Sequence, residues 1–162
     1  MIQMSVGGLG FDPRNLSPMI LLRDPEEMNF LPIWIGIFEA ASIALVLQGI
    51  KPPRPMTHDL LKDVIEKSGC TINRVVISEI QNGTFFSVIE LMRGEKKISI
   101  DARPSDAIAL AMRGETPIFV SENVMLQAKL VNADRDAEEA RKFKEFVSNL
   151  KPEDFTKYYN KD

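Results

Sequence analysis

Apolar residues occur along this chain in short runs, several of which alternate with polar residues, and clusters of Gly, Pro, Asn and Asp separate them. Such runs predict strands. Asn82-Gly83 and Arg93-Gly94 divide the three middle runs, and both dipeptides are typical of hairpin turns. The middle of the chain is therefore predicted to be an antiparallel meander. The predicted strands cover residues 1–9, 18–22, 30–35, 73–80, 84–92, 97–101 and 117–120.

Other segments follow the helical period. Residues 38–48 are apolar or small almost all round and stop at Gly49, whereas residues 58–68 carry a single apolar stripe. A helix without a polar face needs cover on every side, which is hard to provide in so small a domain. We therefore predict a homodimer whose interface uses this helix or the neighbouring strands. Further helices are predicted from the junction at 101–106 to Gly114, over 124–130 and over 134–150.

This order of elements predicts an α+β fold. We expect a single domain over residues 1–131, with a mostly antiparallel sheet and helices packed on it. Residues 132–162 are predicted to form a C-terminal appendage with an amphipathic helix. A chain of 162 residues and 18.2 kDa is long enough to bury a substantial core.

Composition excludes several classes of protein. A formal net charge of -3 gives no electrostatic reason for bulk nucleic-acid binding, so any phosphate binding has to be local. The single cysteine, Cys70, cannot form an intrachain disulfide, and the N-terminus lacks the pattern of a signal peptide, so we expect a cytoplasmic protein. The longest apolar stretch, residues 31–50, is interrupted by polar residues and by Pro32, which predicts a buried strand and helix and no membrane span.

The junction between a predicted strand and helix at residues 101–106 gathers several reactive groups. Asp101 and Asp106 supply carboxylates, Arg103 a guanidinium and Ser105 a hydroxyl. Carboxylate oxygens are the ligands that hard divalent cations prefer, and a bound cation activates water while an arginine neutralises a phosphoryl group. One interpretation is therefore a site for Mg²⁺ or Mn²⁺ and phosphate.

A structural interpretation of the same junction is also open. Pro104 at the first helical position and Asp106 two residues later form a helix-start pattern, and Arg103 can simply pair with a carboxylate. This pattern explains some of the polar groups but not all of them. The sequence leaves both interpretations standing.

The only histidine of the chain begins another helix. Thr57 is a predicted N-cap and Asp59 complements the helix dipole, but His58 gains nothing from the positive end of that dipole. His58 is therefore open as a general base, a metal ligand or a surface residue.

Three further charged residues have both a functional and a structural interpretation. Glu39 stands alone in an apolar helix and needs a partner, which Arg103 or Arg54 can provide. Arg54, held between prolines, and Lys51 are phosphate contacts or solvated loop charges. With one histidine, no H-E-x-x-H motif and no zinc cluster with cysteine exist, and neither a P-loop nor a G-x-S-x-G motif occurs.

Motifs in four segments together resemble the bifunctional nuclease domain. They are Leu31-Pro-Ile-Trp-Ile-Gly36 with Glu39-Ala40, Pro53-Arg-Pro-Met-Thr-His-Asp-Leu-Leu61, Ile100-Asp-Ala-Arg-Pro-Ser-Asp-Ala107 and Pro117-Ile-Phe-Val120. The similarity runs from the N-terminus to about residue 130. It implies an α+β fold, a wedge-shaped homodimer with a large groove, and DNase and RNase activity.

Two functional hypotheses follow. The first is a metal-assisted nuclease with nucleic acid as its substrate. The second is a non-catalytic dimeric binding or regulatory module, in which the same residues form a buried network of arginine–carboxylate pairs. Converging carboxylate oxygens would favour the nuclease with its metal, and closed arginine–carboxylate pairs would favour the module. For the nuclease, the predicted catalytic residues are Glu39, His58, Asp59, Asp101 and Asp106, the metal ligands are Glu39, Asp101 and Asp106, and the substrate-binding residues are Lys51, Arg54, Arg103 and Ser105.

Overall fold

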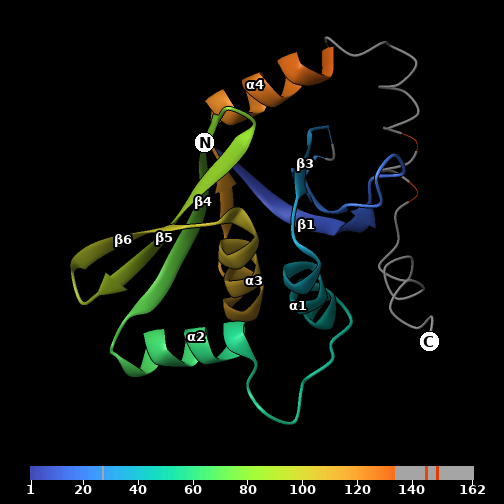
Figure 1. Cartoon of the computed structure of the whole chain (residues 1–162). Helices are drawn as coiled ribbons and strands as arrows, with labels where there is room; N and C mark the ends of the chain where they lie inside the picture. Colours follow the sequence, from blue (N-terminus) through green and yellow to red (C-terminus); the bar gives the residue numbers. More distant parts are fainter. Residues whose placement is uncertain (27, 134–144, 146–148, 150–162) are drawn as a thin grey trace.

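Seven strands form one sheet in the order β3–β2–β1–β7–β4–β5–β6. The computed structural model describes residues 1–26, 28–133, 145 and 149 (Figure 1). Neighbouring strands run antiparallel, apart from β4 and β7, which are parallel. The strands are β1 (Ile2–Phe11), β2 (Pro18–Arg23), β3 (Phe30–Trp34), β4 (Thr71–Gln81), β5 (Thr84–Arg93), β6 (Lys96–Ala102) and β7 (Ile118–Val120).

The predicted meander is confirmed. Val75 of β4 pairs with Ile89 of β5, and Ile89 pairs in turn with Ile100 of β6. Asn82 and Gly83 connect β4 to β5 with φ angles of 49° and 77°. Two successive positive φ angles are what a type I′ hairpin turn requires, and Asn and Gly tolerate them best.

The short strand β7 joins the two halves of the sheet. It pairs antiparallel with the start of β1 and parallel with the middle of β4. Ile118 and Val120 are buried at this junction. Without these three residues, the β1–β3 hairpins and the β4–β6 meander would be separate sheets.

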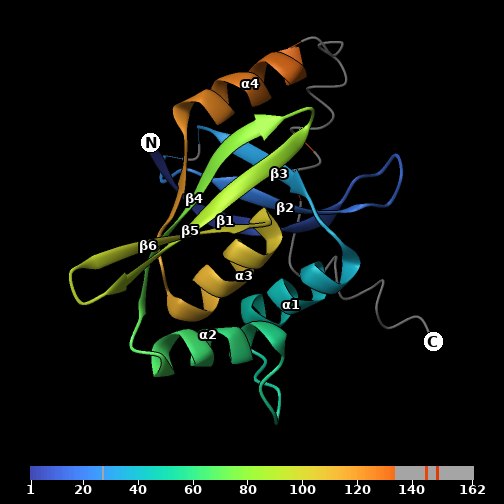
Figure 2. The same cartoon turned by 60° about the vertical axis from the view of Figure 1, so that its left-hand side comes forward.

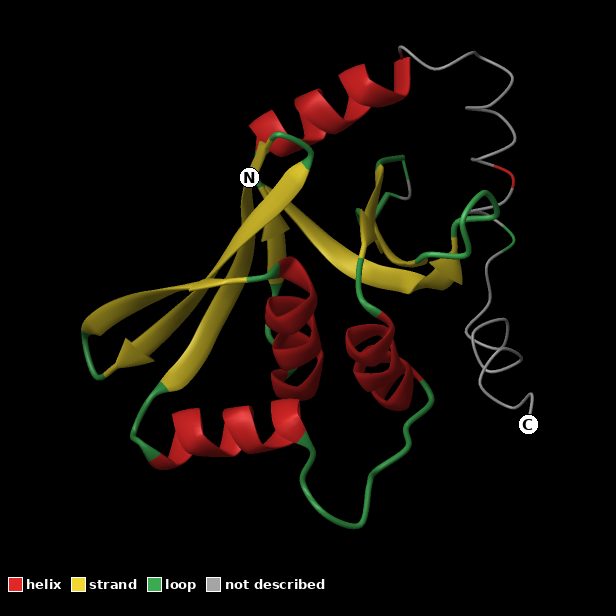
Figure 3. Cartoon of the chain, in the orientation of Figure 1, coloured by secondary structure: helices red, strands yellow, loops and turns green. Residues whose placement is uncertain are grey.

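Three helices gather on one side of the molecule. These are α1 (Ile37–Leu47), α2 (Thr57–Lys67) and α3 (Pro104–Gly114), whereas α4 (Glu122–Ala133) lies at the opposite end (Figures 2 and 3). Helix α3 contacts α1, α2 and the central strands β4 and β5. Its residues are small or aliphatic, so they fit between other elements, and residues 104, 105 and 107–111 are buried.

The predicted α+β class and single domain are confirmed. The predicted appendage over residues 132–162 lies outside the described residues, except for residues 132, 133, 145 and 149. None of the described helices has the length and the apolar run that a membrane-spanning helix needs.

The start of helix α1 is exposed to solvent. Ala40, Ile43 and Ala44 are buried against the rest of the domain, while Ile37 is 48% exposed and Phe38 is 84% exposed. Exposed apolar side chains at the start of α1 are consistent with a surface that a second copy would cover. The homodimer stays a prediction.

Asp12 fixes the connection between β1 and β2. Its carboxylate accepts hydrogen bonds from the backbone N–H and guanidinium of Arg14 at 2.7–3.0 Å and from Nε1 of Trp34 at 3.3 Å. The side chain is only 2% exposed. Hydrogen bonds from Arg14 lower the pKa of Asp12 from 3.8 to about 2, against the opposing effect of burial.

This depressed pKa predicts a loss of stability in acid. An aspartate whose pKa is lower in the folded state contributes stability above its unfolded pKa of 3.8 and loses it as the pH falls through about 2. This shift corresponds to a contribution of about 2 kcal/mol at neutral pH. Urea unfolding at pH 2 to 7 should show a shallower pH dependence for Asp12→Asn than for the wild type, whereas the exposed Glu26→Gln should follow the wild type.

Candidate functional site

Each of the three clustered helices places an acidic residue in its first turn. These are Glu39 in α1, Asp59 in α2 and Asp106 in α3. The positive end of a helix dipole favours negative charge at these positions. Pro104 occupies the first turn of α3, where its missing N–H costs no hydrogen bond, and Arg103 precedes it as the N-cap. Helix-start chemistry therefore concentrates carboxylates where α1, α2 and α3 meet.

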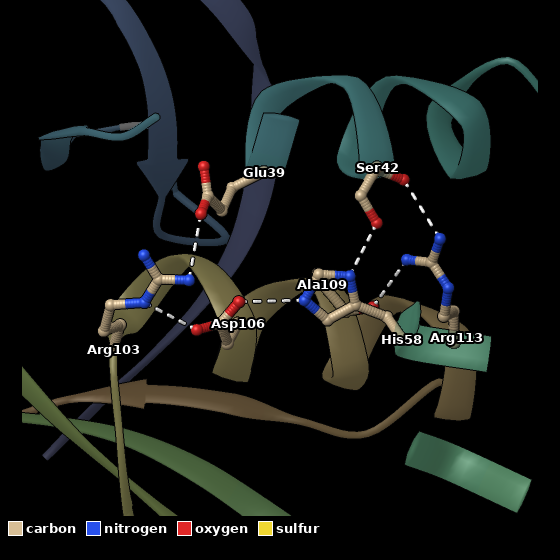
Figure 4. Close-up of polar contacts among 7 residues, drawn as sticks. All are labelled: Glu39, Ser42, His58, Arg103, Asp106, Ala109 and Arg113. Atoms are coloured by element: carbon tan, nitrogen blue, oxygen red, sulfur yellow. Dashed lines mark hydrogen bonds and ion pairs between the residues drawn. The ribbon is translucent and has the colours of Figure 1, made fainter. Parts of the chain in front are cut away.

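Four side chains from these helices, together with Arg103 at the N-cap of α3, form one continuous set of hydrogen bonds, which we call the polar chain (Figure 4). Arg103 donates from Nη2 to Oε1 of Glu39 at 2.9 Å and from Nε to Oδ2 of Asp106 at 2.7 Å. The other oxygen of Asp106, Oδ1, lies 2.9 Å from Nε2 of His58. Nδ1 of His58 lies 2.8 Å from Oγ of Ser42. The polar chain thus runs Glu39–Arg103–Asp106–His58–Ser42.

The charge of Asp106 determines the protonation pattern of the polar chain. Burial would raise the pKa of this carboxyl, but hydrogen bonds from Arg103 and His58 outweigh burial and hold the pKa below its ordinary value. An ionised carboxylate only accepts hydrogen bonds, so Nε2 of His58 carries a proton. In the neutral imidazole, Nδ1 then has the lone pair and accepts the hydroxyl proton of Ser42.

A second, more buried cluster supports the polar chain. Arg113 of α3, 6% exposed, donates from Nε to Oδ1 of Asp59 at 2.6 Å. It also donates to the backbone oxygens of Ala109 at 3.0 Å and Ser42 at 3.2 Å. The other oxygen of Asp59 accepts the backbone N–H of Met56 at 2.9 Å. One guanidinium therefore connects the three helices directly beside His58.

The electrostatic state of Asp59 follows from these contacts. Burial raises the pKa of Asp59, but hydrogen bonds from Met56 and Arg113 lower it by more, so the net pKa is depressed. Both carboxylate oxygens have partners within the domain. The catalytic role predicted for Asp59 from its sequence position stays a prediction, but its contacts are those of a residue that holds α2 against α3.

The structure brings together four of the nine predicted site residues. His58, Arg103 and Asp106 lie in one cluster, and Glu39 pairs with Arg103, one of its two predicted partners. Asp101 is exposed on β6 and takes no part in the polar chain. Lys51 and Arg54 are exposed in the connection between α1 and α2, and Ser105 is buried in α3.

The carboxylates as arranged do not fit the predicted metal site. Within the part of the chain that the structure describes, no group of three or more His, Cys, Asp or Glu side chains is placed to hold a metal ion. Asp106 gives one oxygen to His58 and the other to Arg103, and Glu39 gives an oxygen to Arg103. A divalent cation such as Mg²⁺ or Mn²⁺ therefore stays a prediction from the sequence.

Ser42 and Arg113 were not among the predicted site residues. Ser42 follows Glu39 by three positions in an otherwise apolar helix, and residues three apart lie on the same helix face. That spacing was a usable signal, because a face with a carboxylate and a hydroxyl needs polar partners. Arg113 stands in the last turn of α3, where a basic residue is ordinary, and no local pattern marks its three contacts.

Comparison with known proteins identifies a family for this chain. Residues 20–133 match the model of the bifunctional nuclease domain. The "Uncharacterized protein Rv1829" of Mycobacterium tuberculosis (strain ATCC 25618 / H37Rv) is 41% identical over 162 residues, which covers 94% of this chain and 97% of that protein.

Plant proteins show a more distant similarity. "Bifunctional nuclease 1" of Oryza sativa subsp. indica is 33% identical over 104 residues, covering 61% of this chain and 31% of the rice protein. "Bifunctional nuclease 2" of Arabidopsis thaliana is 28% identical over 109 residues, covering 65% of this chain and 33% of that protein. The similar region is thus about a third of each plant protein. The matched region of our chain contains all five members of the polar chain, and the chain belongs to the bifunctional nuclease domain family.

Proposed function

We propose that this protein hydrolyses phosphodiester bonds of nucleic acids at the polar chain. The observation that carries the proposal is the His58–Asp106 pair, at 2.9 Å, with the guanidinium of Arg103 on the other oxygen of Asp106. A histidine oriented by a carboxylate is a common proton-transfer group, and an arginine beside it suits a phosphate. The names of the plant relatives support the same activity.

Each residue has a defined role in this proposal. His58 moves the proton of the attacking group, and Asp106 holds the imidazole with Nε2 protonated and stabilises its charged form. Arg103 is 66% exposed, and a guanidinium carries five N–H donors, so donors remain for a phosphate oxygen beyond those used on Glu39 and Asp106. Glu39 fixes the orientation of Arg103.

Binding of the nucleic acid is expected to be local and weak. The formal net charge of -3 offers no general attraction, so the exposed cations of the connection between α1 and α2, Lys51 and Arg54, are proposed to contact the backbone near the cleaved bond. Few neutralised phosphates imply a shallow dependence of affinity on salt.

A second candidate function has its own supporting observation. Arg103 is paired with two carboxylates, Glu39 and Asp106, and this closed arrangement is what a structural network would have. In that case the domain is a dimeric binding or regulatory module without catalysis. Direct measurement of cleavage decides between the two functions.

The test compares the wild-type protein with His58→Gln on single-stranded DNA, duplex DNA and RNA of one sequence. Each reaction is run in EDTA and in Mg²⁺ or Mn²⁺. We expect at least one substrate to be cleaved, and His58→Gln to lower the rate about 100- to 10,000-fold, the range for loss of a general base. Exposed Lys67→Gln serves as a control for changes at α2. Equal thermal melting of the variants would show that the fold is intact.

Two results would contradict the proposal. Absence of cleavage of all three substrates under every metal condition would favour the binding module. Cleavage that is unchanged in His58→Gln would separate the activity from the polar chain.

Activity that disappears in EDTA and returns with a cation would support the metal predicted from the sequence, and would require Asp106 and Glu39 to exchange their partners.

A further inference from the structure

In neutral His58, the basic lone pair on Nδ1 is directed at the hydroxyl of Ser42. The Nε2–H group donates its hydrogen bond to Asp106, which leaves Nδ1 as the basic atom, and Nδ1 lies 2.8 Å from Oγ of Ser42. A general base acts on a proton that lies within hydrogen-bonding distance. In this geometry, the proton that His58 can accept belongs to Ser42.

We propose that Ser42 is the nucleophile of the cleavage reaction. This inference rests on the function proposed above and replaces water, as the first attacking group, with the Ser42 hydroxyl. Ser42, His58 and Asp106 have the hydrogen-bonding order of a nucleophile, its base and the carboxylate that orients the base. In the usual serine hydrolase, Nε2 faces the serine and Nδ1 faces the carboxylate, whereas here Nδ1 faces Ser42 and Nε2 faces Asp106. One nitrogen still accepts from the hydroxyl, and the other still donates to the carboxylate.

Two steps complete the reaction. In the first, Oγ of Ser42 bonds to the phosphorus while the bond from phosphorus to the leaving ester oxygen breaks. The Oγ proton passes to Nδ1 of His58 and then to the leaving oxygen, which departs as an alcohol. In the second, water attacks the phosphorus of the Ser42 phosphodiester and gives its proton to Nδ1. The Oγ–P bond breaks, Oγ recovers a proton from His58, and a phosphomonoester is released.

Ser42 is held where this chemistry requires it. Its backbone oxygen accepts a hydrogen bond from Arg113 at 3.2 Å, and the same guanidinium is bound to Asp59, the residue that follows His58. Arg113 therefore binds the backbone of Ser42 directly (Figure 4), and it holds His58 through the neighbouring residue Asp59. Ser42 is partly exposed, whereas Ser105, the hydroxyl predicted from the sequence, is buried in α3.

Direct activation of water would need a different arrangement. His58 would have to give up its hydrogen bond to Ser42 and turn its lone pair toward solvent, although the imidazole is held at both nitrogens and is only 9% exposed. The two mechanisms predict opposite effects of removing the Ser42 hydroxyl, because that removal frees Nδ1 for water.

Covalent labelling and cleavage test the inference together. The wild type, Ser42→Ala and His58→Gln are treated with an alkyl fluorophosphonate, and the modified peptide is identified by mass spectrometry. We expect the phosphonyl group on Ser42 in the wild type and a large loss of labelling in His58→Gln, because an unactivated serine reacts slowly. Ser42→Ala should lower cleavage at least about 1,000-fold with little change in thermal melting. Ser99→Ala, an exposed serine on β6, is the matched control and should keep the wild-type rate.

The outcomes separate this inference from the proposed function. If Ser42→Ala keeps the cleavage rate while His58→Gln loses it, the inference is wrong and the proposed function stands. If the wild type cleaves no nucleic acid, the proposed function fails, and labelling still decides whether Ser42 is an activated nucleophile. Absence of fluorophosphonate labelling at Ser42 would overturn the inference in either case.

Discussion

Replacing Asp106 with Asn is expected to lower phosphodiester cleavage about 100- to 10,000-fold while the domain stays folded. The Asn oxygen would accept from Arg103, and its NH₂ group would then face Nε2 of His58 and donate to it. This shifts the imidazole proton to Nδ1, where it points at Ser42 and leaves no lone pair for the hydroxyl proton. Single-turnover rates and thermal melting curves of the same preparations measure the two quantities separately.

Asp101→Asn is the matched control for Asp106→Asn. Both changes remove one negative charge from the junction at residues 101–106, but Asp101 is exposed on β6 and lies outside the polar chain. If the polar chain performs the reaction, only the change at Asp106 has a large effect. If carboxylates of the junction hold a metal, both changes reduce activity, and the loss depends on the cation. Equal rates for wild type and Asp106→Asn would exclude Asp106 from either mechanism.

Replacing Asp59 with Asn should lower the free energy of unfolding by about 2 to 4 kcal/mol. The change leaves the guanidinium of Arg113, only 6% exposed, without its carboxylate partner. We place the expected loss below the largest values for broken buried ion pairs because Asp59 is itself 30% exposed and partly solvated. Urea denaturation of the wild type and the variant measures the difference.

The control for this prediction is Asp63→Asn, on the same helix, which should change the free energy of unfolding by no more than about 0.5 kcal/mol. Arg113→Met in the Asp59→Asn background should recover part of the lost stability, because the unpaired buried charge is then gone. A variant with unchanged stability and abolished cleavage would instead support the catalytic role that the sequence suggested for Asp59.

Much of the fold could be predicted because its elements are formed by local patterns. The β4–β5–β6 meander depends on alternating residues and on a turn dipeptide, and both are read within a few positions. The place of β7 could not be predicted in this way. Three residues carry almost no periodic signal, and the partners of β7, β1 and β4, are distant in sequence.

Only part of the site could be predicted, because local sequence patterns mark some of its residues and not others. His58, Arg103 and Asp106 stand at helix starts, where unusual residue types are visible against the capping pattern. Ser42 and Arg113 stand inside or at the end of helices, where serine and arginine are unremarkable. Their importance comes from the packing of α1 and α2 against α3, which is a property of the tertiary structure.

The position of β7 affects how the protein gains its activity during folding. Both halves of the sheet consist of hairpins between sequence neighbours, so each closes short loops, whereas pairing of β1 with β7 closes a loop that spans nearly the whole described domain. Closing a long loop costs more chain entropy, and such contacts are expected late. Ser42 follows the first half in sequence, and Arg103 and Asp106 follow the second. Neither half alone contains a complete proton-transfer set, so a nascent or cleaved chain would be inert toward nucleic acid until the two halves have joined.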